Sequence, residues 1–157
     1  MIPRHTLSKT ERLKSYKRIR ILFAQGQKFK VFPLVVYYLL RDENVEEVEG
    51  GLERLREVNP VERVEVVEGL LQMGVSVGKR HFKRAVDRNL LKRRIREAYR
   101  KQKLELKEIL MASGISMDIF FVYSNARISD YKEIELAMQQ GLTILLEKVK
   151  KQTSLTE

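Results

Sequence analysis

The apolar and polar positions of this chain follow two kinds of pattern, one with a helical period and one with a strand period. In residues 8–26 large apolar side chains recur every three or four positions, which predicts an amphipathic helix of about four turns. Ser8 and Glu11 have the spacing of a capping box, and Gly26 is a typical residue just past a helix end. The apolar positions of this helix are Leu13, Tyr16, Ile19, Leu22 and Phe23.

Four later segments predict strands. Residues 28–32 and 34–40 are rich in Val, Phe and Tyr, and Pro33 between them suggests an edge, a bend or a break. Both faces of residues 34–40 are apolar, so we expect a central strand covered on both sides. Residues 70–78 alternate large apolar with small or polar side chains, and residues 117–123 predict a second buried strand.

Two further helices are expected. Residues 78–103 contain no Pro or Gly after Gly78 and consist mostly of good helix formers, and the helix is predicted to continue through residues 104–112. The last helix is predicted to start at Asp130, where Glu133 completes the cap, and to fray into a polar tail from about residue 150.

The helix at 78–103 divides into two faces when its residues are placed at about 100° per residue. Leu91, Ile95, Ala98 and Gln102 share one sector with Tyr99 at its edge, which predicts a face that packs on a core. A second sector is almost entirely basic. It contains Arg88, Asn89, Lys92, Arg93, Arg96 and Arg100.

The overall charge strengthens the interpretation of this stripe as a polyanion-binding surface. The formal net charge is +10, but residues 42–69 carry ten acids and three bases, which leaves about +17 on the rest of the chain. The simplest alternative is that the stripe is a solvated face. Solvated faces usually interleave the two signs of charge, however, so composition alone favours a nucleic-acid partner.

The acidic segment is harder to interpret. Within it, residues 52–58 predict two helical turns and residues 61–67 an exposed strand. A solvated excursion is the plainest interpretation of the segment, and contact with a basic partner is the alternative.

Other classes are excluded by what the sequence lacks. The chain has no Cys, so disulfides and thiolate metal sites are ruled out. We see no secretory signal, and the longest apolar run, residues 31–40, is too short to span a bilayer. We therefore expect a cytoplasmic protein with no membrane partner, built as a single domain over residues 1–157.

Residues 75–97 have a distinctive order of residue types. A predicted strand ends in Lys79 and Arg80 and is followed by a short turn. Within residues 85–97, seven positions then carry specific residue types at a fixed spacing, with no insertion or deletion between them. This order closely resembles the signature of the bacterial ribonuclease P protein subunit family. The matching positions are Ala85, Arg88, Asn89, Lys92, Arg93, Arg96 and Glu97. Leu90 departs from the pattern, because the family usually has a second Arg there; it lies at the far edge from the stripe, so we expect the loss of one peripheral contact.

The resemblance covers most of the chain outside the acidic segment, which looks like an insertion at about 42–69, and the ends. It implies an α+β fold, a two-layer sandwich of order αβββαβα similar to the second domain of ribosomal protein S5. The family also has an uncommon left-handed crossover through the basic helix, whereas general βαβ connections are right-handed.

The resemblance implies two RNA-binding surfaces. The first would meet the ribonuclease P RNA and comprises Lys79, Arg80, Arg84, Arg88, Asn89, Lys92, Arg93 and Arg96. The second is similar to the cleft that holds the single-stranded 5′ leader of precursor tRNA. Its aromatic positions are Phe23 and Tyr37, Ser76 and Arg80 line the same path, and Ile19 stands where many members carry an aromatic. From periodicity alone, core packing is the favoured interpretation of both Phe23 and Tyr16.

No catalytic or metal-binding site is evident in the side chains. Asp87, Asp118 and Asp130 are too scattered to suggest a carboxylate cluster, and His81 fits a surface or RNA-contacting role better than a general base. In the resembled family the RNA subunit and its Mg²⁺ ions perform the hydrolysis. The expectation is therefore a protein with no organic cofactor, whose partners are ribonuclease P RNA and precursor tRNA and which does not require oligomerisation.

Two other classes stay open at this point. A general or ribosome-associated RNA-binding protein would explain the charge but not the spacing of residues 85–97. A self-sufficient metal nuclease would need a carboxylate cluster.

Overall fold

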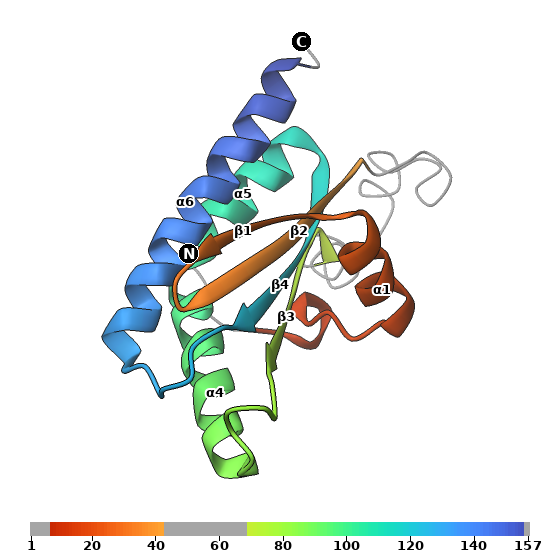
Figure 1. The fold of residues 1–157 in the computed structure, drawn as a ribbon. Coiled ribbons are helices and arrows are strands. Elements are labelled where there is room, and N and C mark those ends of the chain that lie inside the picture. The colour runs from red at the N-terminus through yellow and green to blue at the C-terminus, as the bar shows by residue number, and fades with distance from the viewer. Residues whose placement is uncertain (1–6, 43–68, 156–157) are drawn as a thin grey trace.

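The structure, a computed structural model, describes residues 7–42 and 69–155. The helical turns expected at 52–58 and the strand expected at 61–67 lie outside the described residues, as does most of the acidic segment. The elements occur in the order expected for the fold, with the basic helix divided in two (Figure 1). They are a 3₁₀ turn η1 (Lys9–Glu11), α1 (Tyr16–Gln25), β1 (Gln27–Val31), β2 (Leu34–Asp42), β3 (Leu71–Val77), α4 (Ala85–Gln102), α5 (Leu104–Ser113), β4 (Ile115–Tyr123) and α6 (Tyr131–Leu155).

The four strands form one sheet in the order β1-β2-β4-β3. β1 and β2 are an antiparallel hairpin that turns at Phe32 and Pro33, and β2 also pairs antiparallel with β4. β3 and β4 are parallel, so the chain between them crosses over through α4 and α5. The two strands with apolar side chains on both faces, β2 and β4, are the central ones, which confirms the prediction for residues 34–40.

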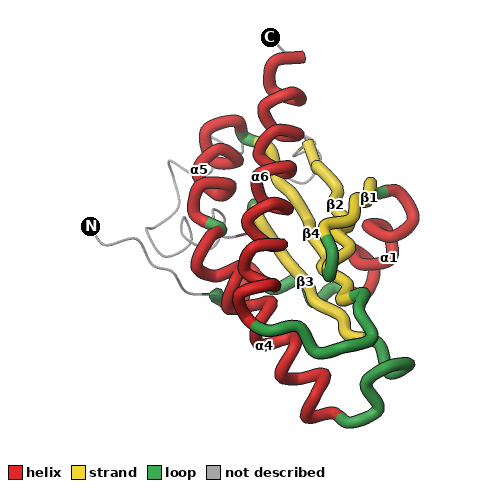
Figure 2. Tube along the Cα trace, turned by 60° about the vertical axis from the view of Figure 1, so that its left-hand side comes forward, coloured by secondary structure: helices red, strands yellow, loops and turns green. Residues whose placement is uncertain are grey.

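Helices α4, α5 and α6 lie on one face of the sheet and α1 on the other (Figures 1 and 2). The main core fills the first interface, where strand residues such as Val36, Ile119 and Phe121 meet helix residues such as Leu91 and Leu145. A smaller cluster of Leu13, Leu22 and Phe120 fills the second. The sandwich therefore has its large core on one side of the sheet and a small, partly open layer on the other.

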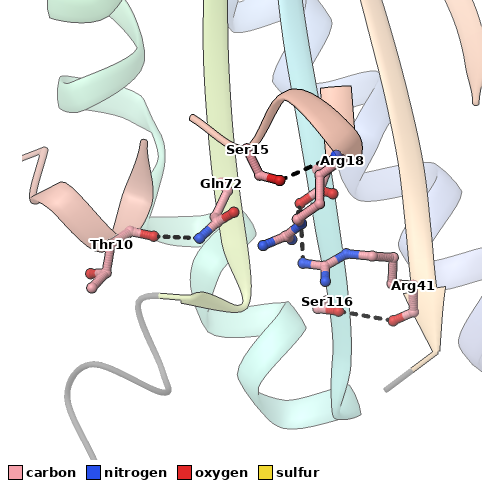
Figure 3. A network of polar contacts seen from close by, with 7 residues as sticks. Thr10, Ser15, Arg18, Arg41, Gln72 and Ser116 are labelled. Carbon is pink, nitrogen blue, oxygen red and sulfur yellow. Dashed lines mark hydrogen bonds and ion pairs between the residues drawn. The ribbon is translucent and has the colours of Figure 1, made fainter. Parts of the chain in front are cut away.

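The N-terminal helix is shorter than the sequence predicts. It begins at Tyr16, where the Ser15 hydroxyl accepts from the Arg18 N–H at 3.4 Å, rather than at Ser8. Residues before it are held by the edge of the sheet instead: the Leu13 N–H donates to the Met73 carbonyl at 2.8 Å, and the Gln72 amide donates to the Thr10 carbonyl at 2.9 Å (Figure 3). These tertiary bonds hold a 3₁₀ turn followed by non-helical residues 12–15, an arrangement that local helical periodicity cannot predict.

Helix ends follow the local signals elsewhere. Gly114 adopts a left-handed conformation with φ of 70° and ends α5, and the Asp130 carboxylate accepts from the Glu133 N–H at 2.9 Å at the start of α6. α6 then continues to Leu155, beyond residue 150 where fraying was expected. None of the helices in the described part of the chain is long and apolar enough to cross a membrane.

The break between α4 and α5 occurs at Lys103, whose side chain is buried. Its ammonium group forms an ion pair with the carboxylate of Glu11, which is also buried, and Lys107 lies 3.6 Å from the same carboxylate. A buried charge is tolerated only when it is paired. This ion pair therefore ties the η1 turn to the junction of the two helices.

Candidate nucleic-acid interface

Helix α4 has the two faces that its sequence predicts. Leu91, Ile95, Ala98 and Tyr99 are buried in the main core, and the Gln102 amide donates to the Glu135 carbonyl on α6 at 3.2 Å. Burial of one face sets the rotation of the helix about its axis. The basic residues consequently face away from the sheet.

Most of the basic side chains expected to bind RNA are accessible. Lys79 and Arg80 are exposed in the turn after β3, Arg84, Asn89, Arg93 and Arg96 are exposed on or beside α4, and Lys92 is half-buried. Within residues 7–42 and 69–155, none of the six cations in this group forms an ion pair. Their mutual repulsion is therefore not offset by neighbouring carboxylates, which favours an anionic ligand.

Arg88 has a second role that the sequence does not indicate. Its guanidinium donates to the carbonyls of Phe82 and Lys83 at 2.7 and 2.9 Å, and thus holds the turn that enters α4. Arg94 similarly donates to the Ser129 carbonyl at 2.6 Å. Arg88 therefore stabilises the shape of the surface as well as contributing charge to it.

Arg100, at the end of the basic sector, is paired. It contacts the Glu97 carboxylate through two nitrogens, at 2.6 and 3.0 Å, and this hydrogen bonding lowers the pKa of Glu97. The basic surface thus ends at the last turns of α4, where an acid balances the charge.

A groove of about 770 Å³ runs between α4 and the N-terminal segment. Leu7 and Arg12 line one wall, and both were absent from the predicted site. The sequence places Leu90 at the far edge from the stripe, but the structure puts it in this groove together with Arg93 and Arg96. The N-terminal segment covers that side of the helix, a tertiary contact that a helical wheel does not contain.

Three of the residues predicted to line the leader cleft lie in an apolar cluster between α1 and the sheet. The Phe23 ring lies 4.5 Å from that of Tyr37 and 5.1 Å from that of Phe120, measured between centroids. Ile19 packs on the same cluster. Phe23 is 43% exposed, so core packing alone does not account for this residue. The core-packing prediction is wrong for Tyr16, which is 74% exposed.

Of the other two predicted residues, Ser76 lies on the same face of the sheet as Tyr37, and Arg80 lies beyond the sheet. Strand pairing sets Tyr37 beside Phe120 and Phe120 beside Gly74, and Ser76 follows Gly74 by two positions on the same face. Gly74 is required there, because a Cβ at this position would lie 2.6 Å from the Phe120 ring. Arg80 is exposed beyond the end of β3, in the turn before α4. The structure thus brings Ile19, Phe23 and Tyr37 together and places Ser76 two strands from Tyr37.

An ion-pair network attaches α1 to the sheet. The carboxylate of Asp118 on β4 is buried and accepts from Arg18 of α1 at 2.6 Å and from Arg41 of β2 at 3.1 Å (Figure 3). Burial raises the pKa of Asp118, while Arg41 and Arg18 act in the opposite direction. This network fixes the position of the helix that carries Phe23.

No metal-binding cluster is found among the described residues: no three side chains of the His, Cys, Asp or Glu type come together there. Asp118 is occupied by two arginines, and Asp87 and Asp130 lie at the starts of different helices. These three carboxylates do not fit a Mg²⁺ site.

An α+β domain with a basic helix face, most of whose cations have no carboxylate partner in the described residues, and a partly exposed aromatic cluster is typical of a nucleic-acid-binding protein. Comparison with known proteins identifies the protein family. The sequence model of the Ribonuclease P family matches residues 7–146, and the chain belongs to the ribonuclease P protein family.

Relatives in sequence agree with this assignment, and solved structures agree with the fold. The chain is 36% identical to the ribonuclease P protein component of Porphyromonas gingivalis strain W83, over 89% of this chain and 86% of the relative, and 35% identical to that of a second strain. It also superposes on the Staphylococcus aureus RNase P protein with a TM-score of 0.53 and 19% identity, over 86% of this chain and 94% of the other. A mutant of that protein with defective mRNA degradation activity gives a TM-score of 0.55, also at 19% identity. The α+β fold class predicted from the sequence is confirmed.

Proposed function

We propose that this chain is the RNA-binding protein subunit of ribonuclease P, which assists a catalytic RNA in removing the 5′ leader from precursor tRNA. The observation that carries the proposal is the group of six cations in the turn after β3 and on α4, none of which forms an ion pair among the described residues, in a chain of this family. Phosphates are the natural counter-charge for such a surface, and binding them releases counterions.

In this proposal two surfaces of the protein bind two different RNA segments. The turn after β3 and the exposed side of α4 bind the ribonuclease P RNA, through the residues already described. The aromatic cluster around Phe23 and Tyr37 binds the leader, because exposed aromatic rings stack on unpaired bases with little dependence on sequence. The Lys28 ammonium, 6.0 Å from the Tyr37 ring centroid, adds positive charge beside that cluster.

The hydrolysis itself is assigned to the RNA. Mg²⁺ held by the RNA would supply the activated water and stabilise the leaving oxygen. The protein's contribution is to hold the catalytic RNA and the leader in register, a positioning effect that needs no catalytic side chain.

Leader removal from a precursor tRNA at low Mg²⁺ tests the proposal. The rate is compared for the protein alone, ribonuclease P RNA alone, and both together. Strong cleavage only with both is expected. Cleavage by the protein alone would reveal an active site in the chain, and no gain over the RNA would make the chain a general RNA-binding protein.

A further inference from the structure

The groove between α4 and the N-terminal segment combines two kinds of surface that a simple phosphate-binding helix does not need. One part is apolar: Leu7 and Leu90 are half-buried in it, and Val86 is 67% exposed. The other part is basic and is formed by Arg12, Arg93 and Arg96. Asn89 adds an amide, which can both donate and accept hydrogen bonds.

The far wall of the groove is held firmly in place. The residues around Arg12 are attached to β3 by the Leu13–Met73 and Gln72–Thr10 hydrogen bonds, and to the α4–α5 junction by the buried ion pair of Glu11. Leu7 packs on the main core. Among the described residues, the walls of the groove are therefore positioned by contacts within the chain, and its volume falls within the roughly 300–1,000 Å³ of typical small-molecule sites.

Its charge indicates an anionic occupant. In the described ranges, Arg12, Arg93 and Arg96 have no carboxylate partner, and the one acid of the groove, Glu97, is already bonded to Arg100. The backbone of a regular RNA duplex would contact the arginines, but its base faces are stacked on one another and cannot be placed against Val86 and Leu90. An unpaired nucleotide has both parts, since its base is apolar on its faces and its phosphates are charged.

We propose that this groove binds an unpaired nucleotide of RNA, with the base against Val86 and Leu90 and the flanking phosphates on Arg12, Arg93 and Arg96. The inference rests on the proposed function, because the RNA is taken to be the ribonuclease P RNA. Asn89 hydrogen-bonds the edge of the base. Leu90 thereby becomes a contact residue of a different chemical type from the Arg that the family usually has, and Arg12 becomes part of the RNA-binding surface.

The test separates apolar contacts from charge. Binding of ribonuclease P RNA is measured over a series of salt concentrations for wild type, Val86→Ala, Leu90→Ala and Arg93→Ala. Leu136→Ala is the matched control, because Leu136 is an apolar residue of α6 that is 57% exposed and is not among the residues that line the groove. A regular RNA duplex without unpaired nucleotides serves as the control ligand.

We expect Val86→Ala and Leu90→Ala each to weaken binding by about fivefold to tenfold with an unchanged salt slope, because each removes base contact and no charge. Binding of the duplex should not change. Dimethyl sulfate probing should find at least one unpaired base that wild type protects and Val86→Ala leaves reactive. Because Val86 is largely exposed, that variant will fold even if Leu90→Ala does not.

Several outcomes would overturn the inference. Unchanged affinity of Val86→Ala, equal losses for the duplex, or the same protection pattern in both proteins would each show that no base occupies the groove. In these cases wild type still binds ribonuclease P RNA, so the proposed function stands. If wild type and Leu136→Ala both fail to bind that RNA more tightly than the duplex, the proposed function itself is wrong.

Discussion

Phe23→Ala is the variant that most directly separates leader binding from structural packing. Phe23 is 43% exposed and contacts the rings of Tyr37 and Phe120. Truncating a fully buried Phe costs about 3–5 kcal/mol. Because only about half of this side chain is buried, the expected loss is about 2 kcal/mol. A domain with a stability of about 5–15 kcal/mol stays folded after such a change.

The effect on binding should be specific to the leader. If a base stacks on Phe23, its removal weakens binding by about 1–3 kcal/mol, or roughly fivefold to 150-fold. Affinities for precursor tRNA with a leader and for mature tRNA are compared, each with ribonuclease P RNA present. Only the leader-bearing RNA should bind more weakly.

Tyr16→Ala provides the matched control on the same helix. Tyr16 is 74% exposed and stacks on Arg20 at 5.8 Å, but it is not a member of the aromatic cluster. This variant should bind both RNAs normally. Equal weakening of both RNAs by Phe23→Ala would refute the cleft assignment, and so would an unfolded protein, which would mean that Phe23 acts as a core residue.

Three further predictions concern charge and stability. Arg93→Ala should weaken binding of ribonuclease P RNA and reduce by about one the slope of the logarithm of the binding constant against the logarithm of the salt concentration. Lys132→Ala on α6 should change neither the affinity nor the slope. An unchanged slope for Arg93→Ala would place this side chain outside the interface. Lys103→Met should lower the free energy of unfolding in urea by at most about 3–5 kcal/mol, because it removes the buried partner of Glu11 and leaves that carboxylate with only Lys107, at 3.6 Å, as a cation. Adding Glu11→Gln should recover part of the loss, and a double variant no better than the single one would contradict this. Burial raises the pKa of the Asp118 carboxyl above its value in the unfolded chain, so the folded protein binds the proton of this carboxyl more tightly. The contribution of Asp118 to the free energy of unfolding is therefore present at low pH and is lost as the pH rises through the folded pKa. Urea titrations across the acidic range should thus show the advantage of wild type over Asp118→Asn shrinking as pH rises, and a growing advantage would mean that the two arginines outweigh burial.

The local sequence was sufficient to predict most helices and strands, and to predict which side of α4 is buried and which is basic and exposed. A basic helix with one apolar side has a single way to pack on a sheet, so Leu91 and Ile95 in the core and Arg93 and Arg96 in solvent follow from helical geometry alone. The central strands were equally predictable, because apolar residues on both faces require cover on both sides.

Other features required the folded chain. Ser8 and Glu11 have the spacing of a helix start, yet Glu11 is instead drawn into a buried pair with Lys103, 92 positions away. Arg88 likewise contacts the turn before α4, and Leu90 lines a groove with the N-terminal segment. Neither arrangement is evident from the sequence of α4 alone. Periodicity reports on neighbours within about one helical turn or along one strand. Which distant segment covers a given face depends on strand order and on long-range hydrogen bonds and ion pairs, and only the tertiary structure decides it.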